Sequence, residues 1–358
     1  MYAYTNSYEH TTKASYSTDE SSGSPVLPGN YPKICGGRIL VTGGAGFIGS
    51  NMCEDFLKND NEVVCLDNFS TGKVENIKGF LSCPKFHLVV GDIRNINDCR
   101  KAVDGADVVF HEAALGSVPR SLQDPITSNE VNVGGFLNML VAAKDANVRR
   151  FIYAASSAAY GDSKALPKVE SSVGRPVSPY AVSKYANELY AHVFGLHYGM
   201  EIIGLRYFNV FGPRQNPDGE YAAVIPRFTS QLISHRPILI NGDGNISRDF
   251  TYVENVIQMN HLAGLCKDSN AFGEVFNTAA GQRNSLNALV KYLKEFLSLY
   301  DPEIPEVEVR YGTFRKGDVQ HSLASIEKAE KILGYKPQFN FEQGLKLSMD
   351  WYWKNLSR

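Results

Sequence analysis

A glycine-rich turn placed between two apolar patterns constrains this fold more than any other feature. The letters V-T-G-G-A-G-F-I-G-S overlap the apolar run 38–42 and lead into a stretch with helical periodicity. Gly43 permits a tight turn, Gly46 lets the backbone approach a pyrophosphate, and Gly49 lets the helix pack closely on the strand. The start of that helix also presents unpaired N–H groups to phosphate oxygens. In this context the turn predicts a dinucleotide-binding domain.

Short apolar runs alternate with helix-length segments between residues 34 and 208. Near-continuous apolar runs of this kind are typical of parallel strands that are buried on both faces. We therefore predict an α/β fold, a Rossmann doubly wound parallel sheet, with strands at 38–42, 62–66, 87–90, 107–110, 150–154 and 202–205. Helices are expected at 131–147 and 180–197, the second beginning after Ser178-Pro179.

The chain divides by its patterns into three parts. Residues 1–33 are rich in Ser, Thr, Asn, Gly and Pro and are expected to form a flexible polar tail. Residues 34–208 form the predicted Rossmann domain. Residues 209–358 form a smaller substrate domain with expected helices at 284–299, 324–333 and 341–355. The run 274–279 is again strand-like and is expected to rejoin the first sheet, so that the two domains interleave.

The overall composition argues against several classes of function. The formal net charge is -2 without a basic block, so nucleic acid is not an expected partner. No apolar run reaches the roughly 20 residues that a membrane-spanning helix needs. The six cysteines are scattered without a C-x-x-C pair, which favours reduced thiols and a cytoplasmic location. His111-Glu112 does not continue as H-E-x-x-H, and no metal site is predicted.

A carboxylate at the end of the second predicted strand indicates which cofactor is bound. Asp67 follows the glycines by roughly 20 residues, where an acid accepts hydrogen bonds from the adenosine ribose hydroxyls. The same charge would repel a phosphate on that ribose, so NAD is predicted rather than NADP. Asp92, after the third strand, is placed either to touch the adenine or to cap the helix that follows.

Tyr180 and Lys184 form the candidate catalytic pair. Residues four apart lie on one face of a helix and can interact. A free tyrosine ionises only near pH ~10, but a neighbouring Lys⁺ and the nicotinamide charge are expected to favour its phenolate. A phenolate can take a proton from a substrate hydroxyl while hydride leaves the same carbon. Ser156, at the end of the preceding predicted strand, is a candidate to relay that proton.

Several longer stretches carry a family resemblance. They are H-E-A-A-L-G-S-V-P-R-S at 111–121, S-P-Y-A-V-S-K at 178–184, L-R-Y-F-N-V-F-G at 205–212, Y-A-A-V-I-P-R at 221–227, I-N-G-D-G-N-I-S-R-D-F at 240–250 and R-K-G-D-V-Q-H-S at 315–322. From about residue 38 to 353 the chain resembles the extended short-chain dehydrogenase/reductases, specifically the bacterial UDP-N-acetylglucosamine 4-epimerases. The resemblance implies an NAD-dependent enzyme that interconverts UDP-GlcNAc and UDP-GalNAc through a transient 4-keto sugar. It also implies a homodimer that packs helices 131–147 and 180–197.

The resemblance assigns roles to the residues at matching positions. The catalytic set that it implies is Ser156, Tyr180 and Lys184. Together with the glycine turn, it implies a cofactor site made of Gly43, Gly46, Phe47, Ile48, Gly49, Asp67, Asn68, Ser70, Gly72, Asp92, Ile93, Ala113, Ala114, Asn132, Tyr180, Lys184 and Tyr207. The implied substrate site is Gly116, Ser117, Ser156, Ser157, Asn209, Ala223, Val224, Asn241, Arg248, Arg315, Asp318 and Ser322.

Within these sets, the resemblance implies more specific contacts. Tyr207 and Phe208 would border the nicotinamide. Asn209, Arg248 and Arg315 would bind the diphosphate, and segments 221–226 and 240–242 would surround the uridine. Two structural alternatives stay open: Arg248 could form a surface ion pair with the adjacent Asp249, and Asn209 could be a turn residue.

Two positions bear on which UDP-sugar is used. In the relatives that this chain resembles, those restricted to UDP-glucose and UDP-galactose carry a bulky tyrosine at the position of Ser322. The resemblance implies that a serine there leaves volume for an N-acetyl group. UDP-GlcNAc and UDP-GalNAc are therefore expected, with their uronic acids and the plain UDP-hexoses as alternatives. Ala158 stands where relatives usually carry a hydroxyl residue that contacts the substrate, which weakens this expectation.

Two other functions share part of these features. A sugar-nucleotide dehydratase or decarboxylase begins with the same oxidation, but dehydratases that resemble this chain need Asp and Glu directly after the triad hydroxyl. Those positions are Ser157 and Ala158 here, which argues against elimination of water. A non-catalytic NAD-sensing regulator is the alternative from a different class, and the intact Ser156, Tyr180 and Lys184 argue against it.

Overall fold

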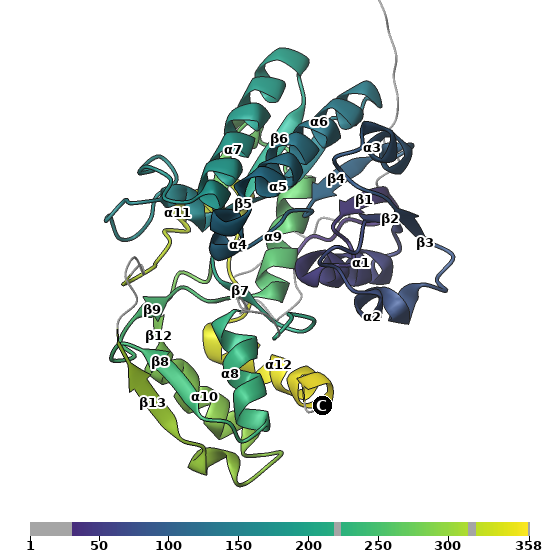
Figure 1. Ribbon diagram of the computed structural model, residues 1–358. Coiled ribbons are helices and arrows are strands. Elements are labelled where there is room, and N and C mark those ends of the chain that lie inside the picture. Colours follow the sequence, from purple (N-terminus) through teal and green to yellow (C-terminus); the bar gives the residue numbers. More distant parts are fainter. Residues whose placement is uncertain (1–30, 218–222, 314–319, 357–358) are drawn as a thin grey trace, which may run out of the picture.

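A parallel sheet forms the centre of the molecule. The computed structural model describes residues 31–217, 223–313 and 320–356. Within them a seven-stranded sheet has the order β11-β6-β5-β4-β1-β2-β3 (Figure 1). Its strands are β1 (Arg38–Thr42), β2 (Glu62–Asp67), β3 (Phe86–Val90), β4 (Val108–His111), β5 (Arg150–Ser156), β6 (Glu201–Tyr207) and β11 (Val275–Thr278). All of their pairings are parallel, which confirms the predicted doubly wound fold.

Helices cover both faces of this sheet. One face packs against α3 (Ile96–Val103), α6 (Phe136–Asp145) and α7 (Pro179–Tyr198), and the other against α1 (Phe47–Lys58), α9 (Val253–Leu265) and α11 (Glu327–Leu333). All four residues of β4 are therefore buried. Full burial of one large apolar side chain contributes about 1.5–3 kcal/mol, so this double layer explains why the strands read as continuous apolar runs.

A second, smaller core lies beyond the carboxyl ends of the strands. There α8 (Val224–Ile233), α10 (Leu286–Leu297) and α12 (Phe341–Leu356) pack around the parallel pair β8 (Ile238–Asn241) and β13 (Val309–Gly312). The remaining α-helices and strands are the short helices α2 (Val74–Ile77), α4 (Val118–Gln123) and α5 (Pro125–Asn129) and the two-residue strands β7 (Val210–Phe211), β9 (Ser247–Arg248), β10 (Thr251–Tyr252) and β12 (Asn284–Ser285).

The two cores share chain segments. β11 pairs with β6, with Thr278 opposite Tyr207, although it comes from the part of the chain beyond residue 208. Helices α9 and α11 come from the same part and contribute Val256, Met259 and Leu333 to the core of the first sheet. The C-terminal part of the chain thus completes both the edge and one face of the Rossmann layer.

Some elements differ locally from the sequence expectations. The helix expected at 131–147 starts earlier, as α5, and passes through a π-helical segment (Glu130–Gly135) before α6. The helix expected at 284–299 is α10, which begins at Leu286 because Ser285 caps it by accepting a hydrogen bond from the Ala288 N–H. The two residues before α10 form β12. The six cysteines are all free thiols, as expected. In the described part of the chain, no helix is long and apolar enough to cross a membrane.

Candidate active site

A cavity of about 450 Å³ opens at the carboxyl ends of β1, β2, β4, β5 and β6. It lies where the strand order diverges, with β2 on one side of β1 and β4 on the other, which is the position that open α/β sheets use for ligands. Of the predicted cofactor and catalytic residues, those that line it are Gly43, Gly46, Phe47, Ile48, Gly49, Asp67, Asn68, Ser70, Asp92, Ile93, Ala113, Ala114, Ser156, Tyr180, Lys184 and Tyr207.

The glycine turn has the geometry of a phosphate cradle. Gly43 has φ +68°, and a Cβ there would come within 2.8 Å of the Cα of Ala113. A Cβ on Gly49 would overlap the carbonyl oxygen of Gly43, so only glycine allows α1 to approach β1 this closely. Gly46 precedes α1 without a side-chain cap, which leaves the first N–H groups of the helix facing the cavity end. These features fit a dinucleotide whose pyrophosphate rests on the helix start.

Asp67 fixes the loops beside that cradle. Its Oδ2 accepts a hydrogen bond from the Ala45 N–H at 2.9 Å, and its Oδ1 accepts one from the Phe69 N–H at 2.8 Å. The side chain is thus a turn former and also lines the cavity. Gly72 lies behind it and does not line the cavity, but a Cβ at Gly72 would come within 2.8 Å of Asp67 Oδ1.

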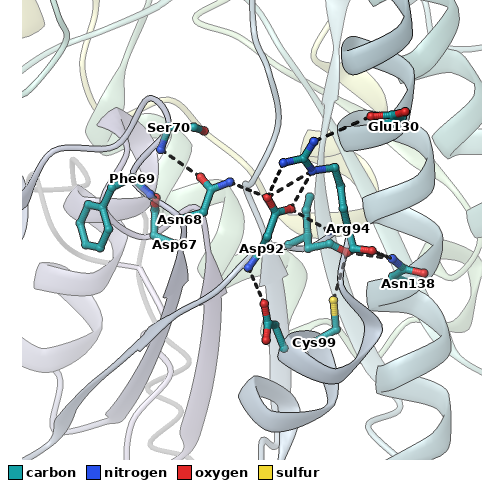
Figure 2. Close-up of polar contacts among 11 residues, drawn as sticks. Asp67, Asn68, Phe69, Ser70, Asp92, Arg94, Cys99, Glu130 and Asn138 are labelled. Carbon is teal, nitrogen blue, oxygen red and sulfur yellow. Dashed lines mark hydrogen bonds and ion pairs between the residues drawn. The ribbon is translucent and has the colours of Figure 1, made fainter.

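Asp92 and Asn68 join the ends of β3 and β2 at the same side of the cavity. The Asn68 amide donates to Asp92 Oδ2 at 2.9 Å, and the Arg94 guanidinium donates to both oxygens of Asp92. Figure 2 shows how these side chains converge on Asp92. The hydrogen bonds from Arg94 are the largest cause that lowers the pKa of Asp92, to about 2. Asn95, not Asp92, caps α3, so Asp92 is a fixed carboxylate at the cavity edge rather than a helix cap.

Ser156, Tyr180 and Lys184 come together at the other end of the cavity. Ser156 ends β5, and a hydrogen bond with it partly lowers the pKa of Tyr180, which burial raises above its usual value. Lys184 Nζ donates to the Ala154 carbonyl at 2.8 Å, and burial lowers its pKa to about 8. Burial thus opposes ionisation of Tyr180, and the predicted phenolate depends on the nicotinamide charge as well as on Lys184.

The first turn of α7 positions this pair. Ser178 caps the helix by accepting a hydrogen bond from the Ala181 N–H at 3.1 Å, and Pro179 occupies the first turn. The Tyr180 N–H donates to Ser121 Oγ at 3.0 Å, which ties α7 to α4. The spacing of four residues then brings Tyr180 and Lys184 to the same cavity wall.

A second cavity of about 160 Å³ lies in the smaller core. Asn241, Val224 and Arg248 line it, together with Phe228 and Leu239 among other residues. Asn209 borders both cavities, and its amide donates to the Asp249 carbonyl at 3.0 Å with the backbone held at φ +36°. Asn209 is therefore both a turn residue and the junction between the cavities.

The Asp249 carboxylate is enclosed by backbone. Its oxygens accept hydrogen bonds from the N–H groups of Ala280 and Ala324, at 3.1 and 3.2 Å, and the side chain is fully buried. Burial raises the pKa of Asp249 to about 7. The residue thus connects the β9 region to the loops at 280 and 324.

Several predicted site residues lie apart from the two cavities or outside the described residues. Gly116 and Ser157 line the first cavity, whereas Ser117 and Ala223 precede α4 and α8. The Asn132 amide bonds both the N–H and the carbonyl of Leu115, behind the cavity wall. Phe208 is fully buried against Tyr160, and Ser322 is partly buried beside β9. Arg315, Asp318 and Tyr221 lie outside the described residues.

Two cavity residues, Glu112 and Arg227, are not among those predicted from the sequence. Glu112 lines the first cavity, and the Tyr207 hydroxyl donates to its Oε1 at 2.8 Å. Burial raises the pKa of Glu112 to about 7, although the Tyr207 hydrogen bond and the Lys184 charge oppose that rise. The sequence could have indicated Glu112 as a site residue, because it directly follows a buried parallel strand at the edge of the sheet where ligands bind. Arg227, in α8, lines the second cavity.

Comparison with known proteins agrees with this geometry. Residues 39–279 match the NAD dependent epimerase/dehydratase family. A putative UDP-glucose 4-epimerase from Methanocaldococcus jannaschii is 36% identical over 320 residues, which cover 88% of this chain and 99% of that protein.

Two solved structures extend the similarity to three dimensions. A UDP-glucose 4-epimerase from Thermotoga maritima, solved with UDP-glucose, has a TM-score of 0.81 at 36% identity over 89% of this chain and 99% of that one. A UDP-N-acetylglucosamine 4-epimerase from Methanobrevibacter ruminantium, in complex with UDP-N-acetylmuramic acid, has a TM-score of 0.82 at 36% identity, with the same coverage. With its glycine cradle and its Tyr180/Lys184 pair, the chain belongs to the NAD-dependent epimerase/dehydratase family and uses NAD as its cofactor.

Proposed function

We propose that this UDP-sugar 4-epimerase interconverts UDP-GlcNAc and UDP-GalNAc. The observation that carries the proposal is the small side chain of Ser322. Its backbone N–H donates to the Ser247 carbonyl at 3.1 Å, which places it beside Arg248 of the second cavity. By the family resemblance, a serine at this position, in place of a bulky tyrosine, would leave volume for an N-acetyl group on sugar carbon 2. The similarity to a protein named as a UDP-N-acetylglucosamine 4-epimerase supports the same substrate class.

Tyr180 is the proposed base. It takes the proton of the sugar 4-hydroxyl, directly or through Ser156, and returns a proton when the sugar is reduced again. When bound, NAD⁺ supplies the hydride acceptor and its positive charge, and is regenerated within the cycle. The Lys184 ammonium adds positive charge near the phenol and can bond the nicotinamide ribose.

Asn209 and Arg248 are the proposed diphosphate ligands, joined by Arg315. A guanidinium fork suits two phosphate oxygens. Val224 and Asn241 would hold the uridine in the second cavity, so that UDP stays fixed while the keto sugar turns. Because Asn209 borders both cavities, it lies where a diphosphate joining sugar and nucleoside would pass.

Ala158 and Ser157 limit the alternatives. Ala158 offers no hydroxyl to the sugar, which would weaken binding by about 0.5–1.5 kcal/mol relative to a hydrogen-bonding residue. Its N–H instead donates to Ser156 Oγ at 3.1 Å. Neither residue is an acid, so the pair needed to eliminate water is lacking at these positions.

The direct test is an interconversion assay without added reductant. UDP-GalNAc, UDP-GlcNAc, UDP-galactose and UDP-N-acetylgalactosaminuronic acid are each incubated with the enzyme, and products are separated by anion-exchange chromatography. We expect the highest kcat/KM for UDP-GlcNAc and UDP-GalNAc. Ser322→Tyr should depress the acetylated substrates more than the plain ones, while Ser322→Ala should preserve the order. Faster turnover of plain or uronic sugars by the unchanged enzyme would contradict the assignment.

We also propose a homodimer through α7. Its outer face exposes Leu189, Val193 and Leu196, the last 69% exposed, and the nearby helix α5 exposes Ile126. Apolar side chains gathered on one helical face favour association. The predicted partner helix at 131–147 adds the partly exposed Leu137 and Val141, and Ile126 of α5 extends the same surface. Leu189→Glu with Leu196→Glu should convert the enzyme to a monomer in light-scattering measurements, and an unchanged mass would refute this contact.

A further inference from the structure

Asn277 is a polar residue inside β11, and its side chain is fully buried at the edge of the main sheet. It has no part in the reaction described above. A buried amide costs free energy unless its donors and its acceptor are all bound. The partners of the Asn277 amide therefore indicate what the residue holds together.

Both ends of the Asn277 amide are hydrogen-bonded. Its nitrogen donates to the backbone carbonyls of Lys168 and Ser325, both at 2.9 Å. Its oxygen accepts a hydrogen bond from the Tyr160 hydroxyl at 2.7 Å. The two carbonyls fix the orientation of the amide, because a carbonyl can accept from the amide nitrogen but cannot bond the amide oxygen. Three segments that are distant in the chain thus meet at one side chain.

The first of these segments is the single 3₁₀ turn Ser157–Tyr160, which follows β5. Ser157 begins the turn and lines the first cavity, whereas Tyr160 ends it and is only 2% exposed. The Tyr160 ring packs in a small apolar cluster with Phe208 and Ala324. Because the turn is so short, the position of Tyr160 also sets the position of Ser157 at the cavity wall.

The second segment is a strap, residues 320–325, which carries Ser322. The Ser322 N–H donates to a carbonyl of β9 at 3.1 Å, and the Lys168 N–H donates to a carbonyl of the strap at 2.7 Å. Asn277 binds the carbonyl of Ser325 at the end of the strap. The same amide therefore connects the strap to the turn that ends at Tyr160.

The strand itself is held without the Asn277 side chain. β11 pairs with β6 through backbone hydrogen bonds over all four of its residues. The Asn277 N–H is bound separately, by the Glu170 carboxylate at 2.8 Å. The side-chain amide is thus left to join the turn and the strap, which approach the proposed sugar site from two sides.

We propose that Asn277 is a positioning residue that holds the Ser157 turn and the strap in register, and so keeps open the space for the substituent on sugar carbon 2. The inference deepens the proposed function and rests on the proposed role of Ser322. Asn277 is absent from the lining of both cavities, so it acts through the segments that it joins. Loss of this link should change the discrimination between sugars more than the binding of the nucleotide or of NAD.

Tyr160→Phe is the most selective test, because it keeps the packed ring and removes only the hydroxyl that binds Asn277. kcat and KM are measured for UDP-GlcNAc and for UDP-glucose. The kcat/KM of UDP-GlcNAc relative to that of UDP-glucose should fall about 2- to 10-fold, as expected for the loss of one buried hydrogen bond. The fall should come mainly from a higher KM for UDP-GlcNAc, because a strap without its link can move into the space of the N-acetyl group.

Tyr352→Phe is the matched control. Tyr352 is also fully buried, and its hydroxyl donates to a backbone carbonyl, that of Gly212, at 3.3 Å in the smaller core. This variant loses a buried phenol hydrogen bond without touching the turn or the strap. Its ratio of kcat/KM values for the two sugars should equal that of the unchanged enzyme.

Two binding measurements separate positioning of the sugar from a general loss of structure. Calorimetric titration with UDP alone and NAD content after gel filtration should be the same in Tyr160→Phe as in the unchanged enzyme. Asn277→Ala removes all three side-chain hydrogen bonds and should enlarge the change in sugar discrimination. If Asn277→Ala does not fold, Tyr160→Phe decides the question, because its core packing is preserved.

The outcomes separate this inference from the proposed function. An unchanged ratio in Tyr160→Phe, or an equal loss for both sugars with a lower melting temperature, would overturn the positioning role and leave Asn277 a purely structural residue. A weakened affinity for UDP alone by the same factor would overturn it as well. If the unchanged enzyme prefers UDP-glucose, the proposed function fails, whereas a relative loss of UDP-GlcNAc turnover in Tyr160→Phe would still support the link.

Discussion

The Asp67 carboxylate accepts a hydrogen bond from the Ala45 N–H at 2.9 Å, and so links the end of β2 to the glycine turn after β1. The residue expected to recognise the ribose therefore also sets the shape of the phosphate cradle. A substitution there acts on two parts of the cofactor at once.

Asp67→Ala should weaken NAD binding by about 10- to 100-fold, or roughly 1.4–2.7 kcal/mol, because it removes a charged acceptor and loosens the turn. Titration of cofactor-stripped protein with NAD by calorimetry measures this change. Asp104→Ala, at an exposed position beyond α3, serves as the control and should bind NAD normally. Equal affinity in the two variants would show that Asp67 does not contribute.

Gly49→Ala should abolish NAD binding or prevent folding, since the added Cβ would overlap the Gly43 carbonyl. The matched control is Gly79→Ala, where a Cβ would meet nothing within 4 Å and φ is not positive. That variant should fold with a change of at most about 1 kcal/mol in the free energy of unfolding, in either direction. Thermal denaturation with and without NAD distinguishes the two, and a Gly49→Ala protein with normal affinity would contradict the cradle geometry.

Tyr180→Phe should retain bound NAD but lose turnover by about 10²- to 10⁴-fold, because phenylalanine cannot exchange a proton with the sugar. Cofactor content after gel filtration and the interconversion rate are the two measurements. Tyr185→Phe, one position beyond Lys184 in α7, is the control and should keep its activity. Comparable rates in the two variants would refute Tyr180 as the base.

The Arg206–Glu188 pair is buried behind the same strand end. Arg206 donates to both Glu188 oxygens at 2.8 and 2.7 Å, and the two side chains are 3% and 8% exposed. Glu188→Ala leaves an uncompensated buried charge and should destabilise the protein by about 3–5 kcal/mol. Glu308→Ala, which breaks the exposed pair with Arg310, should leave the free energy of unfolding nearly unchanged, because water screens that pair. Urea denaturation compares them, and equal losses would contradict the importance of burial.

Stability should decline in mild acid because of His111. Burial, with a contribution from the Lys184 charge, lowers the pKa of His111 to about 3 in the folded protein, whereas an unfolded histidine titrates near ~6.5. Between these values the unfolded state binds the extra proton, so the free energy of unfolding falls by about 1.4 kcal/mol per unit of falling pH. His111→Gln should lose this part of the slope between pH 6 and 4. The exposed His197→Gln should keep it, and identical slopes would contradict the assignment.

Local chemistry made much of the Rossmann layer predictable. The runs ending at Thr42 and Leu66 are apolar because helices cover both faces, so the strand pattern could be read directly. The shared cavity of the glycine turn, Tyr180 and Lys184 was also predictable, because their placement depends on spacing within single elements. The sequence did not indicate that α9 and α11, from the C-terminal part of the chain, pack against the first sheet.

The remaining site features depend on contacts between distant segments. The Glu112 carboxylate is bound by Tyr207, which Asn260 contacts in turn, and these residues lie far from Glu112 in the chain without a joint sequence pattern. The environment of Tyr180 also depends on burial, which raises its pKa although Lys184 is four residues away. Spacing predicts which groups can meet, whereas ionisation depends on the complete enclosure around them.

The late position of β11 in the chain has a consequence during synthesis. β6 emerges from the ribosome well before β11, and until then its outer edge has no strand to pair with. An unpaired edge can recruit a strand from another nascent chain. We therefore expect the sheet edge at β6 to be completed only once Val275–Thr278 has been made, and we expect a fragment that ends after residue 208 to self-associate through that edge.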